Sequence, residues 1–206
     1  MESRRNSFIA SEGIPYILLT AAAVVAVWHY VDLYWAGIPL AVLVYFFLIF
    51  RDPERPVPAV PLGVVSPVDG TVVAVGLTDS SFLGGEAQKI IIRVDSLGTY
   101  TARCPVEGKV LDLNADTEHA ALGTGGLWVR TDEDDDVILR FNGHRFGLAP
   151  RAFMRYGERV GQGQRCAFLR LTRLAEIHLP LNARVQIESG QRVAAGSDLL
   201  ARLPHH

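Results

Sequence analysis

Few side chains of this chain have types and spacings that could support chemistry. Asp69 lies in the stretch SPVDG, where an Asp-Gly pair is typical of a turn whose carboxylate bonds nearby backbone. Cys104 and Cys166 are far apart and lack the C-x-x-C spacing of a metal or redox site. No metal is therefore expected, and both cysteines are predicted to be small buried residues with free thiols.

The elements that hold these residues fall into two parts of different composition. The chain has 206 residues, of which 49% are hydrophobic and 20% charged, with a formal net charge of −2. No stretch beyond the N-terminus is strongly basic, which argues against a nucleic-acid partner. The acidic run 132–136 is contiguous and is not spaced like metal ligands, so it is predicted to be a solvated hairpin turn.

The N-terminal part contains two apolar runs, 14–31 and 33–50. Each has about 18 residues, close to the roughly 20 that a helix needs to cross a bilayer. Amphipathic aromatic residues gather where the runs meet, as expected at a membrane surface: Trp28, Tyr30, Tyr34 and Trp35. The sequence thus predicts a helical hairpin that is either transmembrane or membrane-embedded without crossing fully.

Positive residues flank this hairpin on its outer ends. Arg4 and Arg5 precede the first run, and Arg51 and Arg55 follow the second. This placement predicts a protein of the cell membrane with both termini and the bulk of the chain in the cytoplasm. The predicted divisions are an N-terminal segment (1–13), the hairpin (14–50), a linker (51–63) and a C-terminal domain (64–206).

The C-terminal domain is predicted to be mainly β. Short β-branched runs broken by glycine recur every 8–15 residues or so, at 63–76, 89–94, 109–113, 127–131, 137–141, 166–172, 176–181 and 184–188. The segment 143–157 is the one weak candidate for a short helix.

Two short patterns occur twice in this domain. SPVDGTVVAV and CPVEGKVLDL share Pro-Val-acid-Gly-x-Val, and GERVGQG and GQRVAAG share Gly-x-Arg-Val-x-x-Gly. Such paired half-motifs resemble the barrel-sandwich hybrid folds, in which two similar β layers close over a small core. The chain has two lysines, Lys89 and Lys109, and neither lies at an evident hairpin tip, which argues against a biotinyl or lipoyl carrier.

The order of motifs resembles the short, membrane-associated phosphatidylserine decarboxylases. EGIP (12–15) leads into the apolar hairpin, followed by FRDPER (50–55), VSPVDGTV (65–72) and the glycine-punctuated β domain. The likeness extends to ARCPVEGKV, GERVGQGQRCAFLR and SGQRVAAGSDLLA. It implies a self-cleaving enzyme in which a serine after a glycine becomes a pyruvoyl group. That ketone forms a Schiff base with phosphatidylserine and acts as the electron sink for loss of CO₂.

The resemblance assigns the family's aspartate to Asp69, but two other catalytic positions are substituted. The family's V-H-V-N-R-x-P matches TYTARCP, which places Tyr100 at the histidine. Tyrosine, with an ordinary pKa near 10, is a poor general base at neutral pH. His119, His144 and His178 each stand alone in sequence, and His178 is predicted to be a packed or surface strand residue.

The processing serine is also missing. The family's F-G-S-R matches RLTR, which places Arg173 at the serine, and a guanidinium cannot attack a carbonyl. A shift of one residue makes Thr172 a fallback nucleophile, preceded by Leu171 in place of the glycine. The usual Asn-Glu-Arg triplet is replaced within 121–129.

These substitutions predict a membrane-anchored family member in phospholipid metabolism that does not self-process, with a lipid-binding, scaffolding or regulatory role. No cofactor is expected, and a pyruvoyl group only if self-processing occurs. An active phosphatidylserine decarboxylase producing phosphatidylethanolamine and a non-lipid adaptor of barrel-sandwich type remain alternatives, so enzyme activity stays open. The expected partners are membrane phospholipid and either a second copy or an active paralogue, with Arg51, Arg55 and Arg103 as candidate phosphate contacts.

Overall fold

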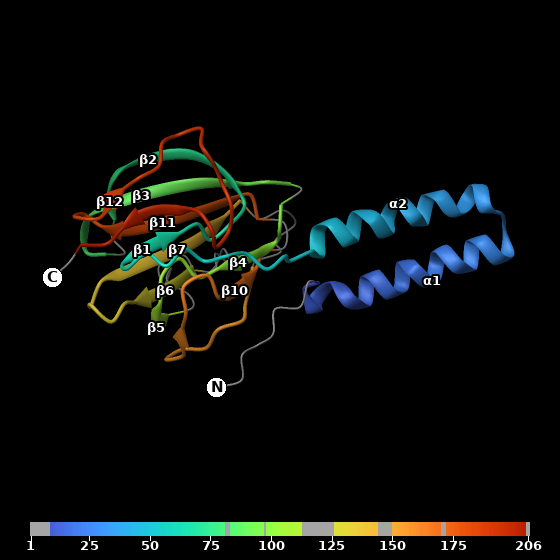
Figure 1. Ribbon diagram of the computed structural model, residues 1–206, viewed down its shortest axis with the longest axis horizontal. Helices are drawn as coiled ribbons and strands as arrows, with labels where there is room; N and C mark the ends of the chain where they lie inside the picture. The colour runs from blue at the N-terminus through green and yellow to red at the C-terminus, as the bar shows by residue number, and fades with distance from the viewer. Residues whose placement is uncertain are drawn as a thin grey trace. The chain divides into compact units, whose positions relative to one another are not determined.

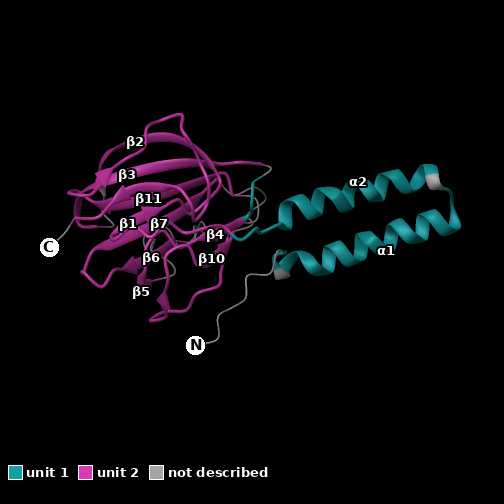
Figure 2. Ribbon diagram, in the orientation of Figure 1, with its two compact units in different colours: residues 1–54, 97–100 teal, residues 55–96, 101–206 magenta. Residues whose placement is uncertain are grey.

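The computed structural model describes residues 9–80, 83–96, 98–112, 126–143, 150–169 and 172–204 (Figure 1). His119, His144 and Leu171 lie outside the described residues, as do parts of the substituted triplet region and of the candidate helix at 143–157. The described chain forms two compact units (Figure 2). One comprises residues 1–54 and 97–100, and the other residues 55–96 and 101–206.

The first unit is a helical hairpin. A 3-10 turn η1 (Ser11–Gly13) leads into α1 (Ile14–Tyr30), and α2 (Leu33–Phe50) returns beside it. A proline in the first turn of α1 suits the helix start, where a missing N–H costs nothing. The open end is closed by the Ala10 N–H, which donates to the carbonyl of Phe50 at 2.8 Å. The Tyr16 and Phe50 rings stack with centroids 5.8 Å apart.

The hairpin does not support the transmembrane form of the prediction. Among the described residues, no helix has the length and apolar character needed to cross a membrane. The two helices have 17 and 18 residues, below the roughly 20 that span a hydrocarbon core. The predicted helical hairpin itself is present at the predicted place.

The second unit is a mainly β domain, as predicted, with antiparallel pairing throughout its described strands. Its main sheet has the order β13-β2-β3-β11-β7-β6-β5-β9. The bounds of these strands are β2 (Gly70–Ser80), β3 (Gly85–Val94), β5 (Gly108–Asp112), β6 (Gly126–Arg130), β7 (Asp136–Asn142), β9 (Arg159–Val160), β11 (Leu174–Pro180) and β13 (Arg192–Val193).

Two smaller sheets complete the β unit. One has the order β1-β14-β12 and the other β4-β10-β8. Their strands are β1 (Gly63–Val65), β4 (Thr101–Arg103), β8 (Arg151–Ala152), β10 (Arg165–Phe168), β12 (Arg184–Val185) and β14 (Leu199–Arg202). In the described part of 143–157 the chain forms β8, so no helix is found there. The predicted turn at 132–136 joins β6 to β7, with Arg130 paired to Asp136.

The core lies mainly against the central strands. Along β11, alternate residues Ala175, Ile177 and Leu179 are completely buried, as are Ile90 and Ile92 on the neighbouring β3. Each of the isoleucine and leucine side chains contributes roughly 1.5–3 kcal/mol when it leaves water. The other face of β11 is buried as well, because Glu176 and His178 are at most 9% exposed. A buried polar face on a central strand requires partners, which are described below.

The two copies of each sequence pattern form the same structure twice. Gly70 in the first half pairs with Val193, and Gly108 in the second half pairs with Val160. At both glycines an added Cβ would lie 2.1 Å from a backbone carbonyl oxygen, of Arg93 or of Arg130. A side chain cannot fit there, which explains why each pattern has glycine at this position.

The two halves also bond to each other reciprocally. The N–H of Val65 donates to the carbonyl of Pro105, and the N–H of Arg103 donates to the carbonyl of Pro67, each at 2.9 Å. Each bond becomes the other when the two halves are interchanged. The repeat therefore has an approximate internal two-fold symmetry. This relation makes Asp69 and Glu107 equivalent positions, one residue before Gly70 and Gly108.

The glycine-rich turns follow the same relation. The Gly196 N–H donates to the Ser66 carbonyl at 2.7 Å, and the Gly163 N–H donates to the Cys104 carbonyl at 2.9 Å. Both glycines have positive φ, 75° and 71°, a conformation that favours glycine. Each turn therefore docks against the Pro-Val-acid-Gly pattern of its own half.

Candidate functional site

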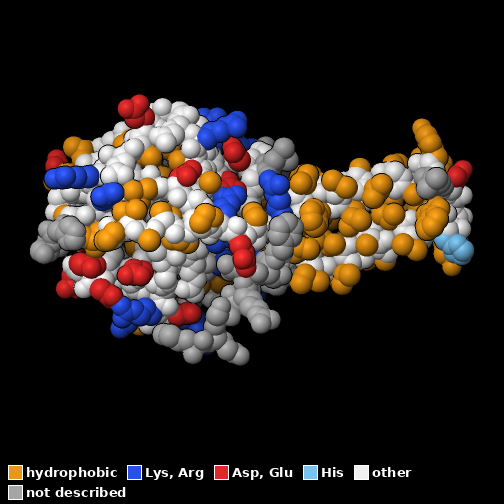
Figure 3. Space-filling model, viewed as in Figure 1, with side chains coloured by type: hydrophobic (Ala, Val, Ile, Leu, Met, Phe, Trp, Pro, Cys, Tyr) orange, Lys and Arg blue, Asp and Glu red, His pale blue; other side chains and the backbone are white. Residues whose placement is uncertain are grey.

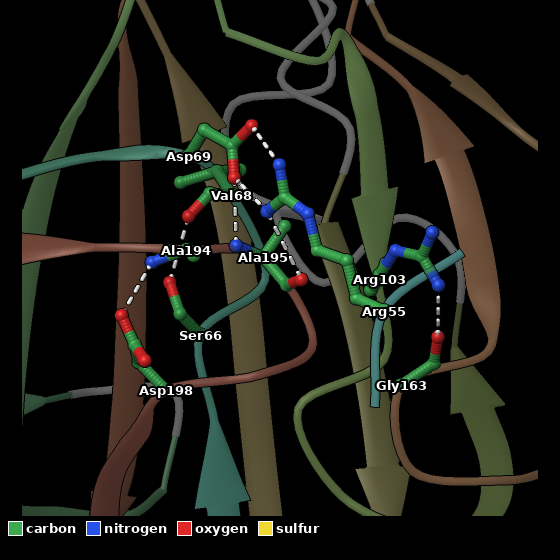
Figure 4. Close-up of polar contacts among 9 residues, drawn as sticks. All are labelled: Arg55, Ser66, Val68, Asp69, Arg103, Gly163, Ala194, Ala195 and Asp198. Carbon is green, nitrogen blue, oxygen red and sulfur yellow. Dashed lines mark hydrogen bonds and ion pairs between the residues drawn. The ribbon is translucent and has the colours of Figure 1, made fainter. Parts of the chain in front are cut away.

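Asp69 ends the turn that leads into β2, and its carboxylate is held by groups from distant parts of the chain (Figure 4). The guanidinium of Arg55 pairs with both carboxylate oxygens, with Nη2 2.8 Å from Oδ2. The backbone N–H of Ala195 donates to Oδ1 at 2.8 Å. Arg55 also donates to the Ala195 carbonyl at 3.3 Å. Asp69 is 8% exposed, so this is a largely buried, two-pronged ion pair.

Short-range hydrogen bonds shape the turns around Asp69. The Ser66 hydroxyl donates to the Val68 carbonyl at 2.8 Å and closes the SPVDG turn. The Asp198 carboxylate accepts from the Ala194 N–H at 2.8 Å and so orders the turn that presents Ala195. Serine and aspartate bond nearby backbone in this way because their side chains are short.

This geometry determines what Asp69 can do in the described structure. Both of its oxygens accept hydrogen bonds, from the Arg55 guanidinium and from the Ala195 backbone. Asp69 thus fastens the linker at Arg55 to the turn at Ala195. The sequence identified both residues but assigned Arg55 to lipid phosphate and did not pair it with Asp69.

Tyr100, which the sequence resemblance assigned to the family's histidine position, is buried with 8% exposure directly before β4. It belongs to the unit that contains the helices, whereas Asp69 and Thr172 lie in the β unit. Its phenol can donate a hydrogen bond and accept one.

Thr172 and Arg173 lie between β10 and β11. Thr172 is 4% exposed, and its hydroxyl donates to the Leu169 carbonyl at 2.6 Å. The side chain therefore closes a local turn. Arg173 is exposed and uses its backbone for pairing, since its carbonyl accepts from the Val94 N–H at 2.8 Å.

The other two arginines proposed for phosphate lie in different surroundings. Arg51 is half-buried and forms a backbone bridge with Ile9 in the helical unit. Arg103 is 3% exposed in the β unit, and its Nη1 donates to the Gly163 carbonyl at 3.1 Å (Figure 4). A phosphate contact stays a prediction for all three arginines.

A polar cluster that the sequence did not reveal lies on β3 and β11. The Nζ of Lys89 is 3.1 Å from Glu176 Oε2, and the Nε2 of His178 is 3.8 Å from the same oxygen. Proximity to His178 and then to Lys89 and Asn142 lowers the pKa of Glu176 to about 2, although burial opposes this. At 3.8 Å the histidine contact is longer than a hydrogen bond, so we regard Lys89 as the firmer partner. His178 is packed, one of the two environments predicted for it.

The strand register explains why Lys89 meets Glu176. His178 lies opposite Lys89 across the β3–β11 pair, and Glu176 is two residues away on the same face. The E-x-H alternation was visible in the sequence, but the partner strand was not. Lys89 thus gives the buried carboxylate of Glu176 a charged partner on this face of β11.

The cysteines are free and buried, as predicted. They lie on neighbouring strand segments, because the Cys104 N–H donates to the carbonyl of Gln164, two residues before Cys166. A hydrogen bond with Cys166, together with burial, raises the pKa of the Cys104 thiol well above its ordinary value. The Cys104 thiol is thus not prepared to act as a nucleophilic thiolate. Among the residues that the structure describes, no group of metal-ligating side chains is found.

The fold and site define a two-part protein: a helical hairpin followed by an internally repeated β domain with an arginine-locked aspartate. Phosphatidylserine decarboxylase proenzymes match nearly all of this chain. The chain is 31% identical over 213 residues to the phosphatidylserine decarboxylase proenzyme of Cupriavidus metallidurans, covering 96% of each chain. It is 32% identical to that of Cupriavidus pinatubonensis, again covering 96% of each, and 31% identical to that of Nitrosomonas europaea, covering 95% of each. This chain belongs to the phosphatidylserine decarboxylase family.

Other comparisons add little. No family model matches the chain. Among solved structures, glucose permease IIA from Mycoplasma capricolum has a TM-score of 0.48 at 17% identity, covering 68% of this chain and 94% of that one.

Proposed function

We propose that this chain is a phosphatidylserine decarboxylase-family protein that acts at a phospholipid membrane without cleaving itself. Its membership places it in phospholipid metabolism. The observation that carries the proposal is the chemistry at the processing position. Arg173 has no nucleophilic oxygen, and the adjacent Thr172 hydroxyl is buried and bonded to the Leu169 carbonyl.

The position assigned to the family's histidine supports the same proposal. Self-processing needs a group that takes the nucleophile's proton, and Tyr100 is a poor one. The retained Asp69 has a structural explanation in its pair with Arg55, so its presence does not require catalysis. The chain would then keep the family's fold for lipid binding, scaffolding or regulation, alone or with an active relative.

The second candidate is an active decarboxylase, because the named relatives are proenzymes of that activity. Here Thr172 would be the nucleophile, and the chain would carry a keto group derived from threonine. The preceding residue is Leu171 in place of glycine, and a β-branched nucleophile after leucine is less free to adopt a strained turn.

Intact mass under denaturing conditions separates the two candidates. For the non-processing protein we expect one species near 22.6 kDa that does not react with carbonyl-trapping reagents. Thr172→Ala serves as the matched control and should leave this mass pattern unchanged. Two fragments with a cut near 171–173, abolished by Thr172→Ala, would establish the active enzyme instead.

We further propose that the hairpin embeds in one side of the bilayer without crossing it. No charged residue occurs in α1 or α2, and large apolar side chains on both are exposed, such as Leu18, Leu19 and Ile38. Figure 3 shows apolar side chains covering the visible face of the hairpin, whereas charged side chains are scattered over the β unit. An exposed apolar surface of this extent is typical of a membrane interaction site.

Vesicle flotation tests the embedding. Leu18→Glu should move the protein out of the vesicle fraction, because a carboxylate is costly in hydrocarbon. Leu77→Glu on β2 is the matched control, since Leu77 is 63% exposed and Leu18 is 65% exposed. Equal flotation of both variants would contradict the proposal.

A further inference from the structure

The two-fold relation within the β unit makes Glu107 the counterpart of Asp69, yet the two carboxylates have different surroundings. Asp69 is buried and holds the guanidinium of Arg55. Glu107 is exposed, and within the described part of the chain no cation pairs with it. One half of the repeat therefore shows how such a carboxylate is used, and the other half offers an equivalent carboxylate that is open.

Glu107 lines a cleft of about 440 Å³ that lies wholly within the β unit. Glu133, from the turn between β6 and β7, supplies a second carboxylate. The apolar part of the lining comes from six side chains: Ala59, Val60, Pro61, Leu62, Val106 and Leu203. We call this the Glu107 cleft. It combines two negative groups with an apolar wall, which suits a cation carried on an apolar stem.

The linker forms one wall of the cleft and is fixed there. The amide of Gln162 donates to the Gly63 carbonyl at 2.6 Å, and the Leu203 N–H donates to the Leu62 carbonyl at 2.8 Å. Gln162 is the counterpart of Ala195, the residue whose backbone helps to hold the Arg55–Asp69 pair. The wall is thus built by hydrogen bonds between described residues.

We propose that the Glu107 cleft binds an arginine side chain presented by an extended segment of a partner protein. The precedent is in the molecule itself: Arg55 lies in an extended, proline-containing linker and reaches the equivalent carboxylate. A guanidinium matches a carboxylate with two parallel hydrogen bonds, whereas an ammonium offers only a point charge. The cleft is larger than one side chain, so residues that flank the arginine can contact its apolar wall. Anionic ligands such as lipid phosphate are disfavoured by Glu107 and Glu133.

This inference does not rest on the absence of self-processing or on membrane embedding. The test uses the full-length chain in detergent and a fluorescent peptide that copies the chain's own linker, FRDPERPVP (residues 50–58). Binding is followed by fluorescence anisotropy. We expect saturable binding that weakens as salt is added, because an exposed ion pair is screened.

Substitutions on both sides locate the contact. Glu107→Gln should weaken binding about threefold, and Glu107→Gln with Glu133→Gln about tenfold, as expected for partly exposed pairs. A peptide with both arginines replaced by glutamine should bind no better than the unsubstituted peptide binds the double variant. Glu188→Gln, an exposed carboxylate in the other half, is the matched control and should bind the peptide as the unsubstituted chain does.

Three results would overturn the proposal. One is the absence of saturable binding by a protein whose thermal melt is normal. Another is equal affinity of the unsubstituted chain and the Glu107→Gln/Glu133→Gln variant. The third is loss of binding in Asp69→Asn with retention in Glu107→Gln, which would mean that the peptide displaces the chain's own linker at Asp69.

Discussion

The two halves of the β unit have the same backbone arrangement, but the carboxylates at their equivalent positions, Asp69 and Glu107, have different partners. In the half that contains Asp69, the linker supplies Arg55 and the site is closed. In the half that contains Glu107, the linker passes as a wall and leaves a cleft of about 440 Å³. The same backbone pattern thus supports either a buried ion pair within the chain or an open cleft, depending on whether an arginine of the linker reaches the carboxylate.

This comparison also bears on the family's catalytic aspartate. A retained residue need not imply retained chemistry, because a largely buried ion pair that loses one partner leaves an uncompensated charge. Asp69 and Arg55 therefore depend on each other for a structural reason. The positions that would show catalysis are those of the nucleophile and the base, for which the sequence predicts substitutions.

The largest expected effect tests whether the two halves share a backbone requirement. Gly70→Ala and Gly108→Ala should each destabilise the protein by about 3 kcal/mol, because the added Cβ would lie 2.1 Å from a carbonyl oxygen in both. Urea denaturation measures both. Gly76→Ala is the control, since a Cβ added there would meet nothing within 4 Å, and it should be nearly neutral. A large effect in one half only would break the two-fold relation.

The Glu176 cluster on β3 and β11 provides a reference away from the two acidic positions, Asp69 and Glu107. The pKa of the Glu176 carboxyl group is lowered from an ordinary 4.5 to about 2. As the pH falls, this carboxylate is therefore protonated in the unfolded chain before it is protonated in the folded protein. The stabilisation is complete above about pH 4.5 and is lost progressively toward pH 2, on the order of 3 kcal/mol in all.

Acid-induced unfolding followed by circular dichroism measures this contribution. Glu176→Gln should reduce the loss of unfolding free energy between pH 4.5 and pH 2. An unchanged acid profile in that variant would show that the contact of Lys89 with Glu176 contributes little to stability.

Opening the closed half should have the next largest effect. Arg55→Gln should lower the free energy of unfolding by about 2 kcal/mol, because Asp69 keeps its backbone donor but loses a charged partner. A double-mutant cycle with Asp69→Asn measures the coupling. Asp132→Asn is the control: it breaks an exposed pair with Arg159 and should cost under about 1 kcal/mol. Equal costs would mean that burial adds nothing to the Arg55–Asp69 pair.

The smallest effect concerns the open half. Gln162→Ala removes one neutral hydrogen bond between the Gln162 amide and the Gly63 carbonyl, and should cost about 1 kcal/mol or less. Urea denaturation again gives the value. If Gln162→Ala lowers the unfolding free energy as much as Arg55→Gln does, the linker is held equally strongly at both halves. The closed site at Asp69 and the open cleft at Glu107 would then not differ in how strongly they hold the linker.

Much of the fold could be predicted because it depends on local patterns. The apolar runs indicated the helical hairpin, and the alternating β-branched segments indicated strands such as β3, β7 and β11. Very short strands such as β8 and β9 have too few residues for a period to be detected. The transmembrane form of the hairpin was not supported, since its described helices fall short of a spanning length.

The candidate site was predictable only in part. Asp69 was identified from its turn, and the buried free thiols from the absence of any spacing motif. The Lys89–Glu176 contact could not be predicted, because it depends on which strands become neighbours and in which register. The roles assigned to Tyr100, Thr172 and Arg173 stay predictions.

The sequence by itself determined the repeated half-motifs, the turn glycines and the absence of a hydroxyl at Arg173. Each of these is a property of a single position or of a few consecutive residues. Only the tertiary structure decided that Arg55 meets Asp69 and that Glu107 faces a cleft. The carboxylate of Asp69 has partners 14 and 126 residues away, and no local pattern encodes which distant groups the folded chain brings within hydrogen-bonding distance.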